Sequence, residues 1–283
     1  MPVPSSLTVL SDKEQKFNAW HAKLSLGFEN RQATTYLTDR SHYGPLLVQR
    51  PFYPEGPVCH VYLIHPPGGV IGGDELEIKI DCREDSEVLI TTPSAAKFYR
   101  SNGKTAYQDV LLKVAGNAVL EWLPQETLLF KGAKVASSLR IELAENARFF
   151  GWEMVSFGRP ACDEIFSADA AQITIGIYSN GKPRLIEQIT VESAMLDSLC
   201  GLGGHALMAS LLAYPAGRAE LEKACAIADQ YRFFGATLIN GVLVGRMLGE
   251  QAEPVRKVFT LIWEALRPGF NNRRACKPRI WAT

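Results

Sequence analysis

The segment His65-Pro66-Pro67-Gly68-Gly69-Val70-Ile71-Gly72-Gly73-Asp74 leads through Glu75 into the run Leu76-Glu77-Ile78-Lys79-Ile80, so a glycine-rich loop enters an alternating strand. Side chains of a strand point to opposite faces in turn, so the aliphatic residues of this run share one face and the charged residues share the other. Asp74 falls on the aliphatic face. The segment therefore predicts a half-buried strand that directs one carboxylate toward the core.

Short runs of the same kind continue from about residue 23 to residue 191, with turn residues between them. This pattern is typical of an all-β domain. The turn Asn180-Gly181-Lys182-Pro183 lies between two alternating runs and predicts a hairpin. The predicted strands cover residues 33–38, 58–64, 76–80, 88–92, 106–114, 118–123, 138–143, 148–155, 172–178 and 185–191.

The pattern changes near residue 193. Segments 199–213, 219–234 and 254–266 lose the two-residue alternation and gain Ala, Leu, Glu and Lys, which predicts helices separated first by Pro215-Ala216-Gly217. We expect a β body over residues 1–192 and a helical C-terminal part with an irregular tail over residues 193–283, packed as one domain. No repeat of fixed length is visible, so spacing leaves a sandwich and a solenoid as alternatives.

Composition limits the classes of function. Lys plus Arg and Asp plus Glu each number 30, so no net charge attracts nucleic acid. No apolar run is long enough to cross a bilayer and the chain opens on no charged-then-apolar leader, so we expect a cytoplasmic protein without membrane association. The six cysteines form no C-x-x-C pair, which argues against a zinc ribbon and favours free thiols in a reducing compartment.

Neither glycine-rich segment predicts a nucleotide site. The loop of residues 68–73 lacks the Lys-Ser/Thr pair that holds phosphate and magnesium in a P-loop. The segment Gly201-Leu202-Gly203-Gly204-His205-Ala206 has the spacing of a dinucleotide-binding turn, but no convincing strand precedes it. His60 and His65 are expected on opposite faces of one strand, so no tight metal site is predicted.

Three carboxylates fall among apolar residues. Besides Asp74, Glu187 shares a face with Leu185 and Ile189, and Glu153 lies in a run that is apolar on both faces. Burial of an unpaired carboxylate is costly, so each must be paired, hydrogen-bonded, protonated or close to water. One interpretation is that loop amides satisfy Asp74 and that arginines such as Arg159 or Arg184 satisfy the two glutamates. The other is that Asp74, Glu153 and Glu187 line a wet internal passage for a divalent cation.

Several ordered blocks make the chain similar to the UreD family of urease accessory proteins, also called UreH. The resemblance covers nearly the whole chain. Its blocks are the loop 65–74, Gly44-Pro45-Leu46, Gln49-Arg50-Pro51-Phe52-Tyr53-Pro54-Glu55-Gly56, residues 91–100, Leu120-Glu121-Trp122-Leu123-Pro124-Gln125-Glu126 and the ending Pro278-Arg279-Ile280-Trp281-Ala282-Thr283. The family's expected glycine-containing turn is replaced here by Ser94-Ala95-Ala96.

This resemblance implies a mainly β fold, a β-helix-like stack of sheets with a few helices in the C-terminal part. It also implies a non-enzymatic maturation factor that joins UreF and the GTPase UreG to urease apoprotein and passes nickel(II) in transit, with no tightly bound cofactor. Spaced carboxylates without C-x-x-C pairs suit passage of a cation better than storage. The alternative is a β-solenoid hydrolase or lyase that acts on a carbohydrate polymer through the same carboxylates.

The C-terminal residues offer a second candidate site. Aromatic and arginine side chains are the usual anchors of protein interfaces. Phe270, Arg273, Arg274, Arg279 and Trp281 bring both kinds together near the end of the chain. They are either a solvated basic surface or a docking site for UreF, which the resemblance implies as a partner.

Overall fold

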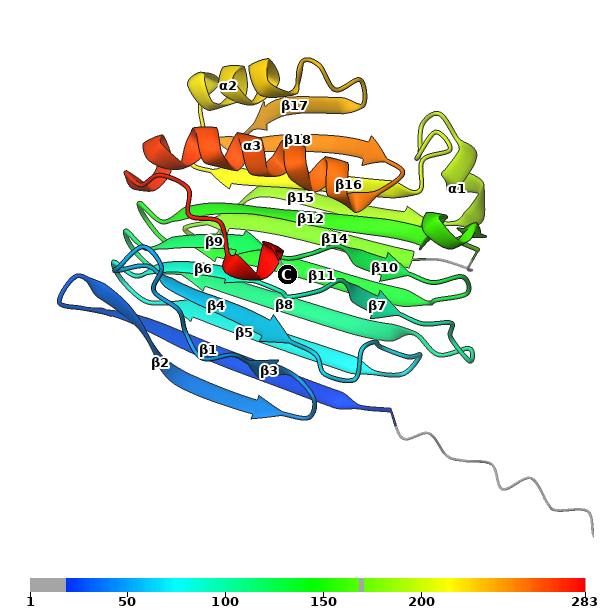
Figure 1. Cartoon of the computed structure of the whole chain (residues 1–283), viewed down its shortest axis with the longest axis horizontal. Helices are drawn as coiled ribbons and strands as arrows, with labels where there is room; N and C mark the ends of the chain where they lie inside the picture. The colour runs from blue at the N-terminus through cyan, green and yellow to red at the C-terminus, as the bar shows by residue number, and fades with distance from the viewer. Residues whose placement is uncertain (1–18, 168–170, 283) are drawn as a thin grey trace, which may run out of the picture.

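The computed structural model describes residues 19–167 and 171–282, and strands account for nearly half of them (Figure 1). One sheet has seven strands in the order β15-β14-β11-β8-β5-β1-β2. The other has eleven, with β17-β18-β16-β12-β9-β6-β4-β3 as its main path and β7, β10 and β13 beside it. The bounds are β1 His21–Arg31, β2 Thr34–Tyr43, β3 Leu47–Val48, β4 Cys59–Ile64, β5 Glu75–Cys82, β6 Glu87–Thr91, β7 Ala96–Phe98, β8 Ala106–Val114, β9 Val119–Leu123, β10 Thr127–Leu129, β11 Val135–Leu143, β12 Arg148–Arg159, β13 Glu164–Ile165, β14 Ala171–Ser179, β15 Lys182–Val191, β16 Leu207–Tyr214, β17 Phe234–Ile239 and β18 Val242–Gly249.

The centre of the molecule is a β-helix-like stack, as predicted. Successive strands alternate between the sheets, with β5, β8 and β11 in the first and β6, β9 and β12 in the second. Neighbours within each of these sets pair in parallel. The coils differ in length, because β5, β8, β11 and β14 begin at Glu75, Ala106, Val135 and Ala171. This irregular spacing explains why no fixed repeat is visible in the sequence.

Side chains that face the other sheet form rows across the strands. Most rows are aliphatic, such as Ile80, Leu112 and Ile141. The row that begins at Leu76 differs, because the neighbouring positions on β8 and β11 are Gln108 and Ser137. Smaller and polar side chains fill less of the space between the sheets, so this row leaves room for a site.

The two longer helices cover the outer face of the eleven-stranded sheet. The short helix α1 spans Ser193–Asp197, α2 spans Arg218–Ala228 and α3 spans Ala252–Asn271, which lies across β12, β16 and β18 in Figure 1. Helix α3 buries Phe259 against Trp152 of β12, and its Trp263 belongs to the same buried cluster. The sheet therefore has two apolar faces, one toward the other sheet and one toward the helices.

The helix predicted over residues 199–213 is wrong, because β16 occupies the end of that segment. Strand β16 pairs with β12 on one side and β18 on the other. It is buried on both faces, so the run Leu207–Tyr214 is apolar except for Ser210 and shows no alternation. A short run rich in Leu and Ala that is buried all round cannot be told from a helix by periodicity.

The C-terminal part consequently mixes strands with helices. The helix predicted over 219–234 ends at Ala228 and gives way to β17, whereas the helix predicted over 254–266 is present and longer. Three strands of this part extend the sheet of β12, so packing continues across residue 192.

The other predictions on the β body agree with the structure. All ten predicted strands are present, and β14 and β15 form the predicted hairpin with Asn180 and Gly181 at φ 49° and 73°. The six cysteines, all within the described residues, are free thiols. Among the described residues no helix is long and apolar enough to span a bilayer.

Candidate functional site

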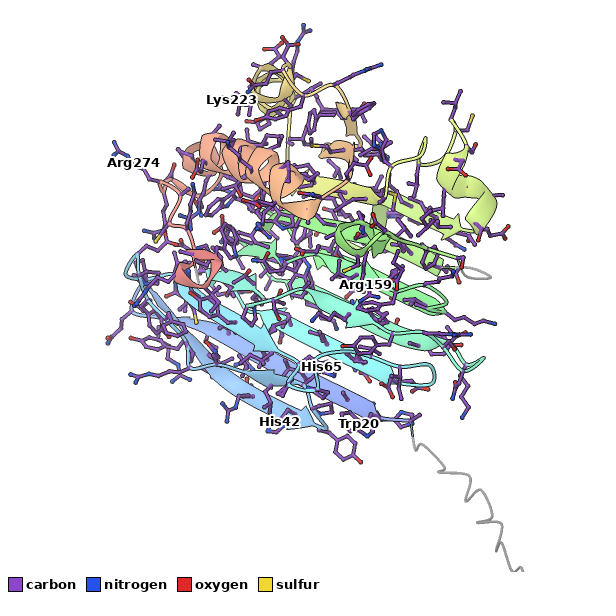
Figure 2. The ribbon with its side chains drawn as sticks, turned by 45° about the vertical axis from the view of Figure 1, so that its right-hand side comes forward. Trp20, His42, His65, Arg159, Lys223 and Arg274 are labelled. Carbon is purple, nitrogen blue, oxygen red and sulfur yellow. The ribbon has the colours of Figure 1, made fainter. Side chains whose placement is uncertain are left out.

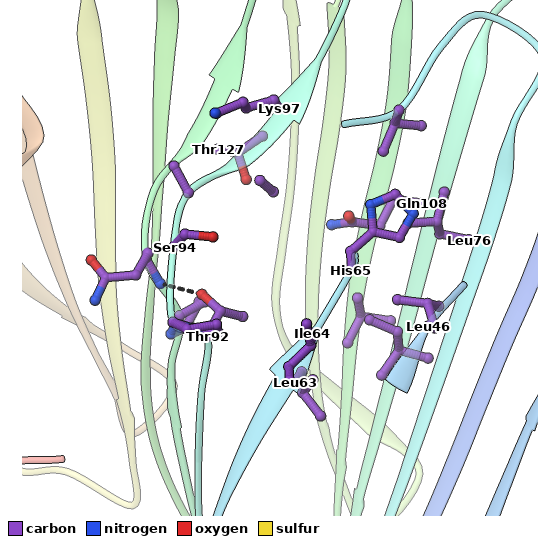
Figure 3. Close-up of a pocket in the computed structure, with 18 of the residues that line it drawn as sticks. Leu46, Leu63, Ile64, His65, Leu76, Thr92, Ser94, Lys97, Gln108 and Thr127 are labelled. Carbon is purple, nitrogen blue, oxygen red and sulfur yellow. Dashed lines mark hydrogen bonds between the residues drawn. The ribbon is translucent and has the colours of Figure 1, made fainter. Parts of the chain in front are cut away.

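A row of three hollows lies between the two sheets. The largest has a volume of about 170 Å³ and lies beside the end of β4, where His65, Ser94 and Gln108 line it (Figure 3). A second hollow of about 20 Å³ shares Gln108 and Glu153 with the first. A third of about 10 Å³ shares Glu153 with the second and adds Glu187. Even the smallest is close to the space that one water molecule needs.

Glu153 lines all three hollows. On β12 its neighbours Trp152 and Met154 belong to the core under the helices, so Glu153 faces the other sheet. Its Oε1 accepts a hydrogen bond of 2.8 Å from the Trp122 indole. Burial raises the pKa of Glu153 to about 7, and the Trp122 hydrogen bond opposes that rise. Near neutral pH this carboxyl can therefore exchange between its protonated and ionised forms.

No cation pairs with Glu153 in the part of the chain that the structure describes. The two arginines proposed as its partners lie elsewhere, since Arg159 pairs with Glu164 at 2.6 Å and Arg184 lies over the Tyr214 ring. Glu153 can therefore release its proton and accept a cation without first breaking an ion pair.

Glu187 lies at the far end of the row. It faces inward on β15, between Leu185 and Ile189, as the alternation predicts. Its partner is Arg246 of β18 rather than Arg184. The Glu187 side chain is 14% exposed and the Arg246 side chain 48% exposed, so this ion pair joins the two sheets where the row approaches solvent.

Asp74 is buried at the start of β5, as predicted, but it lines none of the three hollows. Its two oxygens accept hydrogen bonds from the amides of Trp20 and Ile71, at 2.9 and 3.0 Å. This is the amide-satisfied arrangement considered for Asp74. The carboxylate holds the glycine-rich loop whose residues His65 and Gly68 line the largest hollow.

Oxygen donors without formal charge line the largest hollow as well. Thr92, Ser94, Gln108 and Thr127 contribute hydroxyl and amide groups to its wall (Figure 3). Gln108 was not predicted as a site residue, although it stands at an inward position on an otherwise apolar face of β8. That break in the alternation is the signal that could have found it.

His65 adds an imidazole to the rim of this hollow. It is half-buried, and burial lowers its pKa while the nearby Asp74 opposes the shift. A neutral imidazole can bind a borderline cation such as nickel(II). His60 lies elsewhere, with its Nε2 at 2.6 Å from Glu55 Oε1. Within residues 19–167 and 171–282, no three His, Cys, Asp or Glu side chains converge as metal ligands.

A buried ionic network, which was not predicted from the sequence, lies on the helix side of the eleven-stranded sheet. Arg267 of α3 is 1% exposed and binds the carboxylates of Glu121 and Glu55 at 2.7–2.8 Å. The Trp263 indole donates a 2.6 Å hydrogen bond to Glu121. Although burial alone would raise it, the hydrogen bonds from His60 and Arg267 lower the pKa of Glu55 to about 2. The position of Glu121 inside the otherwise apolar run 119–123 was the sequence feature that could have indicated this network.

The predicted partner-binding residues separate into buried and exposed members. Phe270 is buried against Phe150, and Trp281 packs between Trp152 and Trp263 while donating a hydrogen bond to Thr91. Arg273 pairs with Glu87 at 2.6 Å. Arg274 and Arg279 are exposed, and Arg274 projects from the edge of the molecule in Figure 2. Their role in binding stays a prediction.

Comparisons with known proteins agree on one family. The profile of the family described as "UreD urease accessory protein" matches residues 21–282. The Urease accessory protein UreD of Pseudomonas entomophila (strain L48) is 40% identical over 98% of this chain and 100% of its own length. The proteins of the same name from Escherichia coli and Aliivibrio fischeri (strain ATCC 700601 / ES114) are 40% identical as well, each over 94% of this chain and over 98% and 97% of their own length.

Proposed function

The chain belongs to the UreD family of urease accessory proteins, and we propose that it acts in urease maturation as a non-enzymatic scaffold and nickel conduit. In this role it joins UreF and the GTPase UreG to urease apoprotein and passes nickel(II) through the row of hollows between its sheets. Of the three predicted passage residues, Glu153 and Glu187 line the passage, and Asp74 serves it by positioning the loop at its rim. Nickel is cargo here, held by no tight site.

The single observation that supports this proposal best is that Glu153 lines all three hollows and has no cationic partner among residues 19–167 and 171–282. A conduit needs ligands that bind a cation weakly and release it to the next ligand, because a closed tetrahedral site would retain it. Oxygen donors spaced along the row meet that need. Glu153 supplies the central ligand, Glu187 the ligand near solvent, and Asp74 fixes the loop at the rim.

The hollows also weigh against the alternative of a carbohydrate-active enzyme. Two of the three hollows that Glu153 lines, of about 20 and 10 Å³, admit water or an ion but not a sugar ring, so a polymer could reach Glu153 only from the hollow of about 170 Å³. Paired acid and base carboxylates must flank one scissile bond, whereas Asp74 lines no hollow and is hydrogen-bonded to amides. The function as conduit therefore explains more of the site.

A steric block tests the proposal. Ser137 and Ala136 are neighbours on β11 that point to opposite faces, and only Ser137 lines the second hollow. We expect Ser137→Leu to reduce the nickel content of co-produced urease at least several-fold, because the added side chain fills the row, and Ala136→Leu to leave it unchanged. The measurement is nickel per urease active site by elemental analysis, with both variants shown to be folded by circular dichroism. Equal loading with both variants would exclude transport along this row.

A further inference from the structure

A second cleft, which we call the basic cleft, lies at the ends of three strands of the eleven-stranded sheet. Its volume is about 640 Å³. The residues that line it are Tyr99, Arg100, Phe130, Lys131, Gly132, Glu164 and Ser167. The conduit does not use these residues, so the cleft needs an explanation of its own.

The strand register brings three cations to one level in this cleft. Strands β7, β10 and β12 pair in parallel with Phe98, Leu129 and Phe157 aligned. Two residues beyond that row come Arg100, Lys131 and Arg159. The pairing continues past the strand ends, because the Ser101 amide donates a 2.9 Å hydrogen bond to the Gly132 carbonyl.

The positive charge of this row is only partly compensated. Glu164 binds Arg159 at 2.6 Å and accepts a 3.1 Å hydrogen bond from the Lys131 amide. The exposed side chains of Arg100 and Lys131 form no ion pair within the described part of the chain. Among the described residues, Arg100, Lys131 and Arg159 outnumber Glu164 and its neighbour Asp163.

Aromatic rings form part of the same cleft. The Tyr99 and Phe130 rings meet edge to face with centroids 4.8 Å apart, and the Arg159 guanidinium lies 4.5 Å from the Phe130 centroid. Arginine and aromatic side chains are the groups that most often anchor protein interfaces. The cleft therefore fits a protein segment better than it fits a bare inorganic ion.

The basic cleft adjoins the opening of the conduit. The Tyr99 hydroxyl donates a 3.4 Å hydrogen bond to the carbonyl of Gly68, and Gly68 lines the largest hollow. Lys97, two residues before Tyr99, lines that hollow too (Figure 3). His65 directly follows β4, and Arg159 is the last residue of β12; both are labelled in Figure 2. A protein bound in the cleft would therefore lie beside the opening.

We infer that the basic cleft docks an acidic segment of the protein that exchanges nickel with this chain at the opening beside Gly68. The inference rests on the proposed function. Lys97 gives the opening a positive charge that repels an approaching cation. Carboxylates of a docked segment would offset Lys97, Arg100 and Lys131, so entry of nickel is favoured only while the partner is bound.

The test uses the full chain with Arg100→Glu and Lys131→Glu combined. The matched control is Lys113→Glu with Lys182→Glu, two exposed lysines on β8 and β15 that lie away from the cleft. Binding of each variant to purified UreF, UreG and urease apoprotein is measured by biolayer interferometry. The salt concentration is varied from about 0.05 to about 0.3 M, because screening of exposed charges increases over this range. We expect the cleft variant to bind one partner at least about tenfold more weakly, with a flatter salt dependence, and the control to bind all three normally.

Three results would overturn the inference. The cleft variant could bind all three partners with unchanged affinity. Alternatively, the cleft variant and the control variant could both lose affinity for all three partners to the same extent. The wild-type chain could also bind inorganic phosphate in the cleft by calorimetry with no effect on any partner, which would assign the cleft to a phosphate ligand. Nickel content of urease is measured in parallel. If the wild-type chain does not raise it, the proposed function fails, whereas normal loading by both variants contradicts the cleft inference alone.

Discussion

Glu121 and Glu153 lie on neighbouring strands of one sheet and both accept a hydrogen bond from a tryptophan indole, yet their surroundings differ in charge. Glu121 faces the helices, where Arg267 and Trp263 bind it at 2.6–2.8 Å. Glu153 faces the other sheet, where the Trp122 indole binds it and three hollows surround it. One carboxylate is compensated by a buried cation, and the other is left next to space.

This difference separates a structural carboxylate from a functional one. A buried charge with a complete set of partners is expensive to disturb and holds two elements together. A half-buried carboxyl with a raised pKa beside a hollow has no such set of partners, and groups of this kind cluster at functional sites. The same sheet thus provides stability on its helix side and a candidate nickel ligand on its inner side.

The largest expected effect comes from Arg267→Met. Removal of the guanidinium leaves the Glu121 and Glu55 carboxylates buried without their cation, so we expect a loss of about 3–5 kcal/mol in the free energy of unfolding. Chemical denaturation at pH 7 measures it. The double variant Arg267→Met with Glu121→Gln should recover part of that loss. A single variant as stable as the wild type would show that the network contributes little.

Glu153→Gln should increase the free energy of unfolding, whereas Arg267→Met decreases it. The pKa of Glu153 is about 7 in the folded chain and lower in the unfolded chain, so the wild type loses stability as the pH rises from about 4 through 7. We expect the variant to be more stable than the wild type by about 1–3 kcal/mol at pH 8 and nearly equal at pH 4. Urea denaturation at both pH values measures the difference. A variant less stable than the wild type at pH 8 would place a hidden cation beside Glu153.

Asp74→Ala tests a residue that shares a feature with each of the two glutamates. Like Glu121, Asp74 has hydrogen-bond partners for its carboxylate, and like Glu153 it is proposed to serve the conduit. Loss of the two amide partners should cost about 1–3 kcal/mol. Because the loop at the rim of the conduit is then less fixed, we also expect a several-fold reduction of nickel in urease. Thermal denaturation and elemental analysis measure the two effects, and a stable variant with normal loading would remove Asp74 from the account.

The smallest effect is expected for Arg246→Gln. The ion pair with Glu187 is partly exposed, so its loss should cost no more than about 1 kcal/mol. Urea denaturation of the variant and the wild type at pH 7 measures the difference in the free energy of unfolding. A loss well above about 1 kcal/mol would show that this ion pair holds the two sheets together despite its exposure.

The β body was predictable from the sequence because its strands alternate. Runs such as 76–80 and 106–114 are apolar on one face, and their bounds in β5 and β8 agree within a few residues. Strand β16 was not predictable, because burial on both faces removes the alternation that marks a strand. The β-helix-like winding of the coils was predicted only from the family resemblance, because loops of unequal length hide the repeat in the sequence.

The site was predictable in part. Alternation placed Asp74 and Glu187 inward, and the apolar run around Glu153 showed that it is shielded. It could not show which side of the sheet Glu153 faces or that Arg246, sixty or so residues away in the chain, pairs with Glu187. The network of Arg267 joins residues still further apart. Such pairs depend on how coils and helices pack, which local periodicity does not contain.

The most direct test of the account is the nickel content of urease matured with Glu153→Gln, beside Glu145→Gln as a control at an exposed turn. Glutamine keeps the size of Glu153 and its acceptor for the Trp122 indole but cannot carry the negative charge that binds a cation. We predict at least about a tenfold loss of nickel per urease site with Glu153→Gln, equal to about 1.4 kcal/mol or more, and normal loading with Glu145→Gln. Normal loading with both folded variants would contradict the claim that nickel passes Glu153.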